Sequence, residues 1–399
     1  MTVIGVLRER SDEPRVSLVP QDVAALVQAG FEVVVEHEAG IRAGFRDKDY
    51  EARGARTGGK DEVLAAEVLV QVRAYGADRG DGEDVPAGLR PGHVTVGLGN
   101  SLGNPAAAQA VAKAGVTSFC LELLPRTTRA QAMDVLSSQA VLAGYRAALV
   151  GAERLAKVLP MMSTAAGTLP PAKVLVVGAG VAGLSAIATA RRLGALVSAY
   201  DVRPEAREQV ESVGGMFVAL PLDTSEGSAG GGYAAAMGED FYRRQQELLA
   251  ATVASSDIVI TTAQVPGRRA PVIVTEEMVR RMAPGSVVVD IAAAQGGNCE
   301  VTRPDEEVLA AGVHVLGPSN IVAGLAPHAS QLFSKNISNF LKLILNSEGV
   351  KLDLDDVLIA ETLVTHESAV VHPAVLQRLG PEENAESEHV TPSTSPVRS

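Results

Sequence analysis

Short valine-rich runs alternate with alanine-rich stretches along most of this chain. In the first third, five apolar runs predict strands, at residues 3–7, 31–36, 68–72, 94–98 and 117–121. Residues 20–29 and 104–114 predict helices between them, and each helix ends at an Ala-Gly pair that is typical of a helix C-terminus. This alternation predicts a mostly parallel sheet covered by helices.

The same pattern returns in the second half of the chain. A long helix is predicted from about residue 129 to residue 159, where Pro160 ends it. Six more strands follow, at residues 173–177, 195–200, 216–219, 257–261, 287–291 and 313–316. Six parallel strands with helices between them are typical of a doubly wound dinucleotide-binding sheet. A second long amphipathic helix is predicted at about residues 330–346.

Two long helices that flank the second sheet predict a discontinuous architecture. The expected fold class is α/β, with two Rossmann-like doubly wound parallel-sheet domains joined by long helices and a cleft between them. Residues 1–135 plus 325–380 would form one composite domain, and residues 136–324 the other. The tail at 381–399, rich in Glu, Ser, Thr and Pro, is expected to be disordered.

Composition and charge exclude several classes of protein. The formal net charge of −12 argues against nucleic acid or an acidic membrane surface as a partner. Cys120 and Cys299 form no CxxC pair, which argues against a disulfide scaffold and fits a reducing cytoplasm. The seven histidines show no metal-ligand spacing, so no metal site is expected. The apolar segment at 333–345 is interrupted by polar residues and is too short to span a bilayer.

The strongest local motif is the glycine-rich run Gly178-Ala179-Gly180-Val181-Ala182-Gly183, which follows an apolar strand and opens a helix. Gly178 allows a tight turn, Gly180 lets the backbone approach a pyrophosphate, and Gly183 allows close helix–strand packing. Phosphates then lie at a helix N-terminus, where free N–H groups favour negative charge. The motif predicts that domain 136–324 binds a dinucleotide.

Asp201 ends the next strand, close to the spacing of about 20 residues expected for an acidic side chain on the ribose hydroxyls. A carboxylate there selects NAD over NADP, because it repels a 2′-phosphate. Arg203 weakens this inference, since an arginine can accommodate that phosphate. A plain surface aspartate at a strand end is the alternative.

Several longer motifs carry a resemblance to a known family. They are RVSLVP (15–20), AGFRDKDYEARGA (43–55), LLPRTTRAQAMDVLSSQAVLAGYRA (123–147), TTAQVPGRRAPVIVTEEMV (261–279) and GGNCEVTRPD (296–305). Through about residue 373 the chain resembles the NAD(H)-binding alpha subunit of proton-translocating NAD(P) transhydrogenase. The alanine dehydrogenases, which share the fold, are the related group.

The resemblance implies a set of site residues. It assigns direct roles in hydride transfer to Arg126, Gln131 and Asp134, and places these three with Ser137 at the nicotinamide end. It further assigns NAD(H) contacts to the glycine motif (Gly178, Gly180, Val181, Ala182 and Gly183), to Asp201, Val202 and Arg203, to Gly232 and Tyr233 of a lid, and to Gln245 and Gln264.

Spacing bears separately on the nicotinamide end. Gln131, Asp134 and Ser137 follow one another at i, i+3, so on one continuous helix they would share a face. Solvated polar groups at a helix start are the alternative interpretation. The Gly- and Ser-rich stretch at 222–238 predicts a mobile surface loop, which is either a tolerated insertion or the lid that the resemblance implies.

Alanine dehydrogenases use a catalytic lysine and histidine, and this chain departs from both. Arg73 stands where the lysine is expected and Asn100 stands near the place of the histidine, while His93 is at the start of a strand. Loss of the general base favours transhydrogenation over amino-acid oxidation. An alanine dehydrogenase-like oxidoreductase and a non-catalytic NAD(H) sensor remain the alternatives.

The resemblance also implies partners. NADH bound here would pass hydride to NADP⁺ on an NADP(H)-binding subunit, and a separate membrane-spanning subunit would translocate protons. The chain would form a homodimer in the cytoplasm, peripheral on the inner membrane through its partners.

Overall fold

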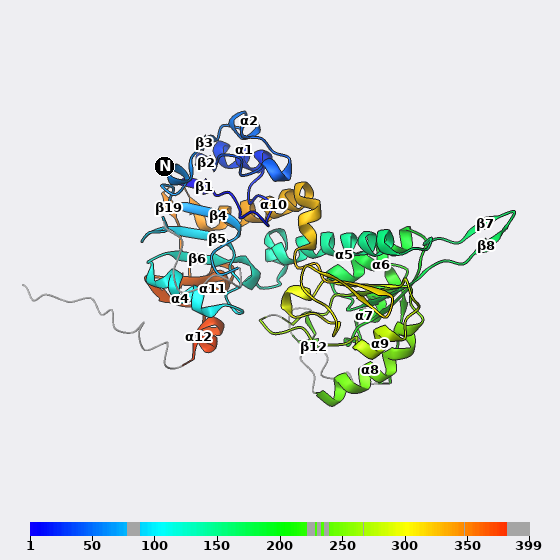
Figure 1. The fold of residues 1–399 in the computed structure, drawn as a ribbon. Coiled ribbons are helices and arrows are strands. Elements are labelled where there is room, and N and C mark those ends of the chain that lie inside the picture. Colours follow the sequence, from blue (N-terminus) through cyan, green and yellow to red (C-terminus); the bar gives the residue numbers. More distant parts are fainter. Residues whose placement is uncertain are drawn as a thin grey trace, which may run out of the picture. The chain divides into compact units, whose positions relative to one another are not determined.

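The computed structural model describes residues 1–77, 88–221, 228–229, 233–234, 239–265, 267–346 and 348–380 (Figure 1). The chain divides into two compact units. The first contains Met1–Val135 and the chain from Ala326 onward, and the second contains Leu136–Leu325. Each unit is built around one large sheet.

The sheet of the first unit has eight strands in the order β21-β20-β6-β5-β4-β1-β2-β3. Their bounds are β1 Val3–Val6, β2 Glu32–Glu36, β3 Arg56–Gly58, β4 Val68–Arg73, β5 Val94–Leu98, β6 Thr117–Cys120, β20 Leu363–His366 and β21 Ala369–Val370. Strands β1 to β6 are all parallel, in the doubly wound order 3-2-1-4-5-6. The five predicted strands are confirmed; β3 and the antiparallel pair β20–β21 were missed.

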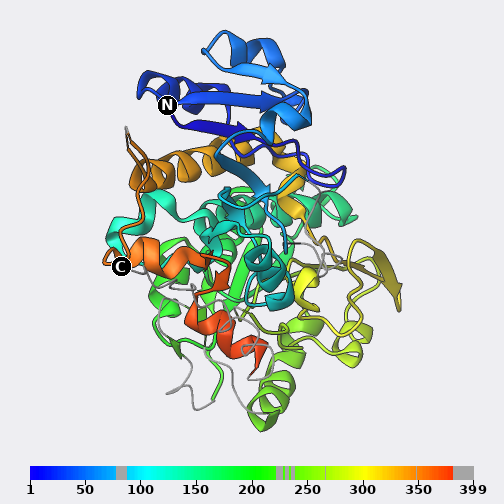
Figure 2. The same cartoon turned by 90° about the vertical axis from the view of Figure 1, so that its left-hand side faces the viewer.

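The helices of the first unit come from two parts of the chain that are far apart in sequence, α1 to α4 and α10 to α12. They are α1 Pro20–Gln28, α2 Asp47–Glu51, α3 Lys60–Val63, α4 Pro105–Lys113, α10 Ala326–Ile344, α11 Val357–Thr362 and α12 Pro373–Leu379. Figure 2 shows α10, in orange, beside the blue N-terminal elements. The Phe340 ring of α10 packs edge-on against Phe119 of β6, with ring centroids 5.4 Å apart. The predicted helix at 330–346 is therefore confirmed, with an earlier start.

The sheet of the second unit has seven strands in the order β11-β10-β9-β14-β15-β17-β16. Their bounds are β9 Lys173–Val177, β10 Leu196–Tyr200, β11 Met216–Phe217, β14 Ile258–Thr261, β15 Val287–Asp290, β16 Glu307–Ala310 and β17 Val313–Leu316. The six predicted strands are all present and parallel. The missed seventh, β16, is an antiparallel edge strand. Both large sheets are mostly parallel, so the fold class predicted from the sequence, two Rossmann-like parallel-sheet domains, is confirmed.

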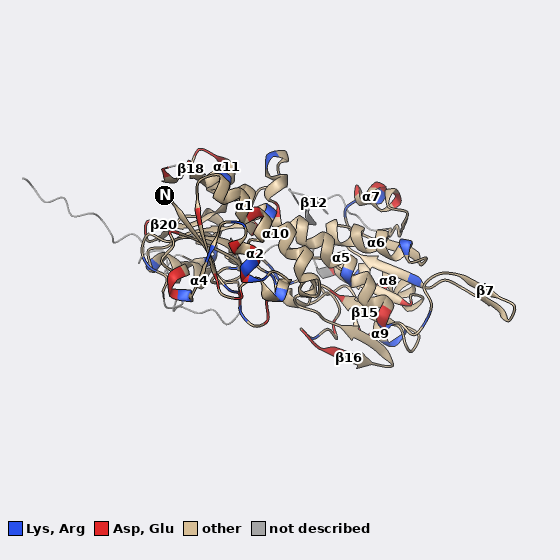
Figure 3. Ribbon diagram, turned by 90° about the horizontal axis from the view of Figure 1, so that it is seen from above, with Lys and Arg blue, Asp and Glu red and all other residues tan. Residues whose placement is uncertain are grey.

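The α-helices of the second unit are α5 Val135–Arg154, α6 Val181–Arg192, α7 Ala206–Ser212, α8 Glu239–Ala254 and α9 Glu276–Arg280. Helix α5 begins one residue before the start of the second unit at Leu136. A hairpin of β7 (Met162–Thr164) and β8 (Gly167–Leu169) follows α5, and Figure 1 shows it extending away from the sheet. Charged residues of both signs are distributed over many elements (Figure 3). Within the described ranges, no helix is both long and apolar enough to cross a bilayer.

The prediction of one long helix at 129–159 is wrong at both ends. Residues Thr128–Met133 form a 3₁₀ helix, η3, and Asp134 leaves the helical region with ψ of 89° before α5 begins. The interruption has a tertiary cause, because Ala130 and Met133 are buried and the Ala132 carbonyl is hydrogen-bonded to α10. At the other end α5 stops at Arg154, ahead of Pro160.

Two predictions fall largely on residues beyond the described ranges. The tail at 381–399 lies outside them, as does Gly232 of the predicted lid. Around Gly232, the structure gives only a short antiparallel pair of strands, β12 Ser228–Ala229 and β13 Tyr233–Ala234.

Candidate functional site

The glycine turn joins β9 to α6 in the second unit. Gly178 has φ of +94°, in the left-handed region that favours glycine, and its carbonyl oxygen accepts a hydrogen bond of 2.9 Å from the Thr262 hydroxyl. A Cβ on Gly183 would collide with the same Gly178 carbonyl. A Cβ on Gly180, in contrast, would meet no heavy atom within 4 Å. The turn is therefore closely packed behind Gly178 and Gly183 and open in front of Gly180.

The opening in front of Gly180 faces the start of α6. Gly180 is the N-cap residue and adds no side-chain cap, and the first intrahelical bond runs from Leu184 N to Gly180 O at 2.8 Å. The N–H groups of Val181, Ala182 and Gly183 have no acceptor within the helix, and they carry the positive end of its dipole. This arrangement can bind a pyrophosphate.

Helix α5 packs closely against this end of α6. A Cβ on Gly144 would collide with the Ala182 carbonyl, and the Ser185 hydroxyl donates to the Val141 carbonyl at 2.7 Å. The glycine at 144 therefore lets the two helix backbones meet beside the turn. Ser137, a predicted site residue, lies in the first turn of α5.

Asp201, at the end of β10, is bonded to the glycine turn. Its side chain is buried, and Oδ2 accepts the Ala179 N–H at 2.7 Å. Oδ1 accepts the backbone N–H and the Nε–H of Arg203, both at 2.9 Å, and Arg203 Nη2 donates to Oδ2 at 2.9 Å. This hydrogen bonding to Asp201 raises the pKa of Arg203 above its usual value. The structure thus does not support the alternative of a plain surface aspartate.

Gln245 of α8 is fully buried against the same strand end. Its Nε2 donates to the hydroxyl of Tyr200 at 3.0 Å, and Tyr200 immediately precedes Asp201. Burial raises the pKa of Tyr200 to about 12, so the phenol is neutral. The Oε1 atom of Gln245 has no hydrogen-bond partner among the residues that the structure describes. A buried, unpartnered carbonyl is costly, so this atom is a natural contact for a ligand.

Gln264 follows β14 and is exposed. Its Nε2 donates to the Ile291 carbonyl and to Oε1 of Gln295, both at 3.2 Å. It therefore lies where the carboxyl ends of β14 and β15 meet, beside β9 in the same sheet.

Sequence reasoning missed Asn298, which fixes the backbone next to Gln264. Asn298 is fully buried; its Oδ1 accepts the Ala263 N–H at 2.9 Å, and its Nδ2 donates to the carbonyls of Ala263 and Pro271, each at 2.8 Å. Its own N–H donates to buried Asp290 at 2.7 Å. The signal available was the motif GGNC, whose two glycines, Gly296 and Gly297, both have positive φ.

The residues predicted at the nicotinamide end do not share one helix. Gln131 is exposed on η3, Asp134 is half-buried at the break, and Ser137 is on α5. The prediction that these three share one helix face is wrong, because the chain leaves the helical region at Asp134. Exposed Arg126 precedes η3 and, with Gln131 and Asp134, belongs to the first unit; Ser137 and the glycine turn belong to the second.

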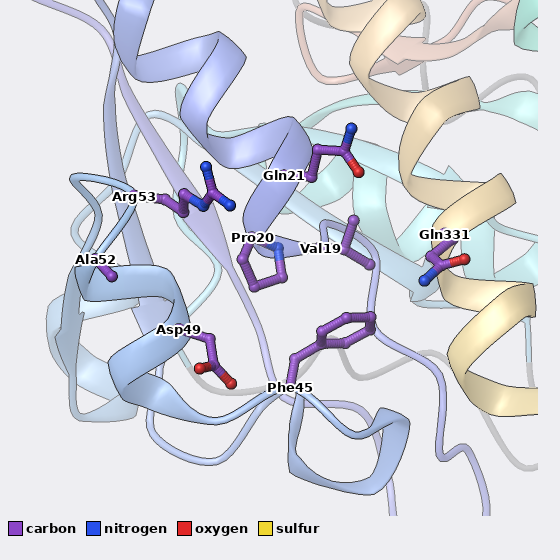
Figure 4. Close-up of a pocket in the computed structure, with 8 residues that line it drawn as sticks. All are labelled: Val19, Pro20, Gln21, Phe45, Asp49, Ala52, Arg53 and Gln331. Carbon is purple, nitrogen blue, oxygen red and sulfur yellow. The ribbon is translucent and has the colours of Figure 1, made fainter.

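A pocket of about 340 Å³ lies in the first unit, near the start of α1 (Figure 4). Its lining residues are Val19, Pro20, Gln21, Phe45, Asp49, Ala52, Arg53 and Gln331. None of the predicted site residues is among them. This pocket is therefore separate from the glycine turn and its neighbours.

The described residues include no cluster of three or more His, Cys, Asp or Glu side chains that could hold a metal ion.

Comparison with known proteins agrees with this geometry. The model of the N-terminal domain of alanine dehydrogenase/PNT matches residues 5–143, and the model of the C-terminal domain matches residues 147–373. The chain belongs to the alanine dehydrogenase/PNT family. The match to the family's C-terminal domain thus covers most of the second unit together with α10 and α11, which pack in the first.

Within the family, this chain is more similar to transhydrogenases. An NAD(P) transhydrogenase subunit alpha polypeptide of Rhodospirillum rubrum is 44% identical over 381 residues, which cover 93% of this chain and 98% of that protein. The crystal structure of transhydrogenase from Sinorhizobium meliloti is 42% identical, with a TM-score of 0.79, and the match covers 93% of this chain and 99% of that one. A solved L-alanine dehydrogenase is 26% identical, with a TM-score of 0.76, over 95% and 99% of the two chains. The resemblance to transhydrogenase alpha subunits is confirmed.

At three positions this chain departs from the catalytic lysine and histidine expected of an alanine dehydrogenase. Arg73 ends β4 and forms a 2.6 Å ion pair with Asp12. Buried His93 precedes β5, at the opposite end from the strand's carboxyl edge, and contacts Arg90. Burial lowers the pKa of His93, as does the charge of Arg90. Asn100 has φ of +48° in the turn after β5.

Proposed function

We propose that this chain is the NAD(H)-binding subunit of a proton-translocating NAD(P) transhydrogenase. It would transfer hydride directly between NADH and NADP⁺, with the NADP(H) held on a partner subunit. The observation that carries the proposal is the bonding of Asp201 to the glycine turn through Ala179, in a chain that is 44% identical to a transhydrogenase alpha subunit.

The residues around the turn fit the parts of NAD(H). The first turn of α6, at Val181, Ala182 and Gly183, would bind the pyrophosphate. Asp201, with Val202 and Arg203 beside it, would meet the adenosine ribose. The Arg203 guanidinium is held by the Asp201 carboxylate, which favours a ribose hydroxyl over a 2′-phosphate at this position.

Further contacts with NAD(H) would come from residues near the carboxyl ends of the strands, from the lid and from the nicotinamide end. The unpartnered Oε1 of Gln245 and the exposed Gln264 are on the carboxyl edge of the same sheet and would line the cofactor. Gly232 and Tyr233 would close over it as a lid. Ser137 would contact the nicotinamide end together with the η3 group of Arg126, Gln131 and Asp134.

The proposed reaction needs positioning more than acid–base chemistry. NADH supplies the hydride, and the residues of this chain hold its ring with the reactive face towards the partner's cofactor. Alignment of two reactants lowers a barrier by about 7–11 kcal/mol. Gln131 and Asp134 would orient the ring through hydrogen bonds, and Arg126 would neutralise negative charge beside it.

The proposed assembly contains separate polypeptides. Proton movement would need a membrane-spanning subunit, and the second cofactor an NADP(H)-binding subunit, so this chain would sit in the cytoplasm, peripheral on the inner membrane. The β7–β8 hairpin supports a homodimer. All six of its strand residues are exposed, including Met162 and Leu169, and an isolated two-stranded ribbon with open edges is marginally stable alone.

Alanine oxidation is the second candidate function, and the first unit argues against it. An amine oxidation needs a general base, and His93 is buried with a lowered pKa while Arg73 is paired with Asp12. A non-catalytic NAD(H) sensor is the third candidate, and only a partner-dependent assay distinguishes it from a transhydrogenase.

Reconstitution tests the proposal. The purified chain is mixed with an NADP(H)-binding transhydrogenase subunit, and NADH-dependent reduction of NADP⁺ is followed. Exchange that requires both proteins is the expected result. NADH formation from alanine and NAD⁺ by this chain alone would establish the alanine dehydrogenase alternative, and absence of both activities would favour the sensor.

A further inference from the structure

The main-chain carbonyl of Ala132, next to Gln131, accepts two side-chain hydrogen bonds from one helix. Nδ2 of Asn336 and Nδ2 of Asn339, both on α10, lie 3.0 Å from the Ala132 oxygen. The two asparagines are three residues apart, so they project from the same face of the helix. All three residues belong to the first unit, although Ala132 is more than 200 positions from both asparagines in sequence.

Helix α10 is a firmly held support for these two amides. Near its N-terminus, the Ser330 and Ser334 hydroxyls accept the N–H groups of Val16 and Val19, at 3.0 and 2.9 Å. Ser334 also donates to buried Asp22 at 2.7 Å. The helix is further anchored by fully buried apolar side chains along its length, those of Phe333, Ile337 and Phe340.

The segment that α10 supports is weak by itself. A 3₁₀ helix has poorer hydrogen-bond geometry than an α-helix and is seldom longer than one turn or so. In η3 the closing bond from Asp134 N to Gln131 O is long, at 3.4 Å. The position of Gln131 and Asp134 therefore depends on contacts outside η3.

A second contact holds the other side of Gln131. The Arg129 guanidinium pairs with the carboxylate of Asp356, which is also the N-cap of α11 and accepts the Leu358 N–H at 3.0 Å. The segment is thus tied to α11 before Gln131, through the Arg129 side chain, and to α10 after it, through the Ala132 main chain.

We propose that Asn336 and Asn339 are positioning residues for hydride transfer, which set the place of Gln131 and Asp134 by holding the Ala132 carbonyl. The inference rests on the proposed function, in which these two side chains orient the nicotinamide. Neither asparagine is assigned a contact with the cofactor. Their loss lets η3 shift, and a displacement of about 1 Å at a reacting group can slow a reaction about 100-fold.

The test replaces both asparagines with aspartate, which keeps the shape and removes the donating NH₂ groups. Single-turnover hydride transfer is measured with saturating NADH and the NADP(H)-binding partner, and the NADH dissociation constant is measured separately. The double variant Asn336→Asp/Asn339→Asp is expected to slow transfer between about 10- and 100-fold. The NADH affinity is expected to stay within about threefold, because the glycine turn and Asp201 are unchanged.

Two further variants keep the test decisive. Asn339→Ala, at a half-buried position, removes one of the two bonds without disturbing the core and should give an intermediate rate. Ser338→Ala is the matched control, since Ser338 lies between the asparagines, is buried, and has a hydroxyl without a partner among the described residues. It should transfer hydride at the wild-type rate.

Gln131→Asn, measured in parallel, separates this inference from the proposed function. If Gln131→Asn slows transfer and both asparagine variants are normal, the positioning role is wrong and the function stands. If Gln131→Asn is also normal, the role given to η3 in the proposed function is wrong. Parallel loss of rate and of NADH affinity in the asparagine variants would also overturn the positioning role.

Discussion

The Arg203 guanidinium donates to both carboxylate oxygens of Asp201, with Nε 2.9 Å from Oδ1 and Nη2 2.9 Å from Oδ2. Both side chains are at least nine-tenths buried. The same carboxylate receives the Ala179 N–H of the glycine turn. The arginine is therefore held by the aspartate, and the aspartate by the turn.

Asp201→Asn is expected to lower the preference for NADH over NADPH by about tenfold or more, which corresponds to about 1.4 kcal/mol. The amide still accepts from Ala179 through its oxygen, but it loses the charge that repels a 2′-phosphate and releases Arg203 to meet one. Dissociation constants for NADH and NADPH, measured by fluorescence titration, check this. Arg203→Lys, which keeps the positive charge, is the control; an unchanged ratio in Asp201→Asn would contradict the assignment.

Two glycine substitutions should separate binding from stability. Gly180→Ala places a methyl in open space at the α6 N-terminus, so the melting temperature should hardly change while NADH binding weakens. Gly183→Ala drives a methyl into the Gly178 carbonyl and should destabilise the fold by roughly 1–3 kcal/mol. Urea unfolding and NADH titration of both variants measure the two effects. Tight NADH binding by Gly180→Ala would exclude the pyrophosphate from this turn.

The double variant Tyr200→Phe/Gln245→Leu removes both members of a buried polar pair. Replacing both partners with apolar groups of similar shape is nearly neutral for stability, since the unpartnered Oε1 disappears with them. NADH affinity should nevertheless fall, because that oxygen is assigned to the cofactor. Melting curves with and without NADH test this: a wild-type shift on adding NADH would show that Gln245 makes no contact.

The strands were predictable because their signal is local. Valine-rich runs between glycines and prolines identified six strands of the second sheet, and the glycine motif identified the turn. The position of Asp201 directly after β10 was also predicted, while its contact with the ribose stays a prediction. Its bonding to Ala179 and Arg203 was not visible in the sequence.

The break at Asp134 was not predictable from local signals. No glycine or proline occurs between Arg129 and Ala143, and the residues there favour a helix. The helix break is stabilised by the asparagines of α10, which bond to Ala132. From the sequence alone these asparagines were only polar residues within an apolar segment. In the fold Asn336 is buried and its side-chain amide donates to Ala132.

Glu9 predicts a pH dependence of stability in the first unit. Its buried carboxylate accepts the N–H groups of Val72 and Arg73, at 2.6 and 3.2 Å, and burial raises its pKa to about 8 from 4.5. The folded chain thus holds the Glu9 proton more tightly than the unfolded chain does. The protonated Glu9 side chain contributes fully to the free energy of unfolding below about pH 4.5, and this contribution is lost as the pH rises to about 8.

Unfolding free energies of the wild type and of Glu9→Gln, whose side chain does not titrate, measure this dependence. Between about pH 5 and pH 8 the wild type should lose stability relative to the variant, with a slope of at most about 1.4 kcal/mol per pH unit. Parallel curves for the two proteins would show that Glu9 does not titrate in this range.

Direct transfer between two nucleotides is the central claim, and an isotope measurement tests it most directly. NADH carrying deuterium on the transferred position of C4 is incubated with the chain, an NADP(H)-binding transhydrogenase subunit and NADP⁺ in ordinary water. We expect the deuterium to appear in NADPH without dilution by solvent, and Gln131→Asn to slow its transfer. Unlabelled NADPH, or no NADPH while alanine is oxidised by the chain alone, would contradict it.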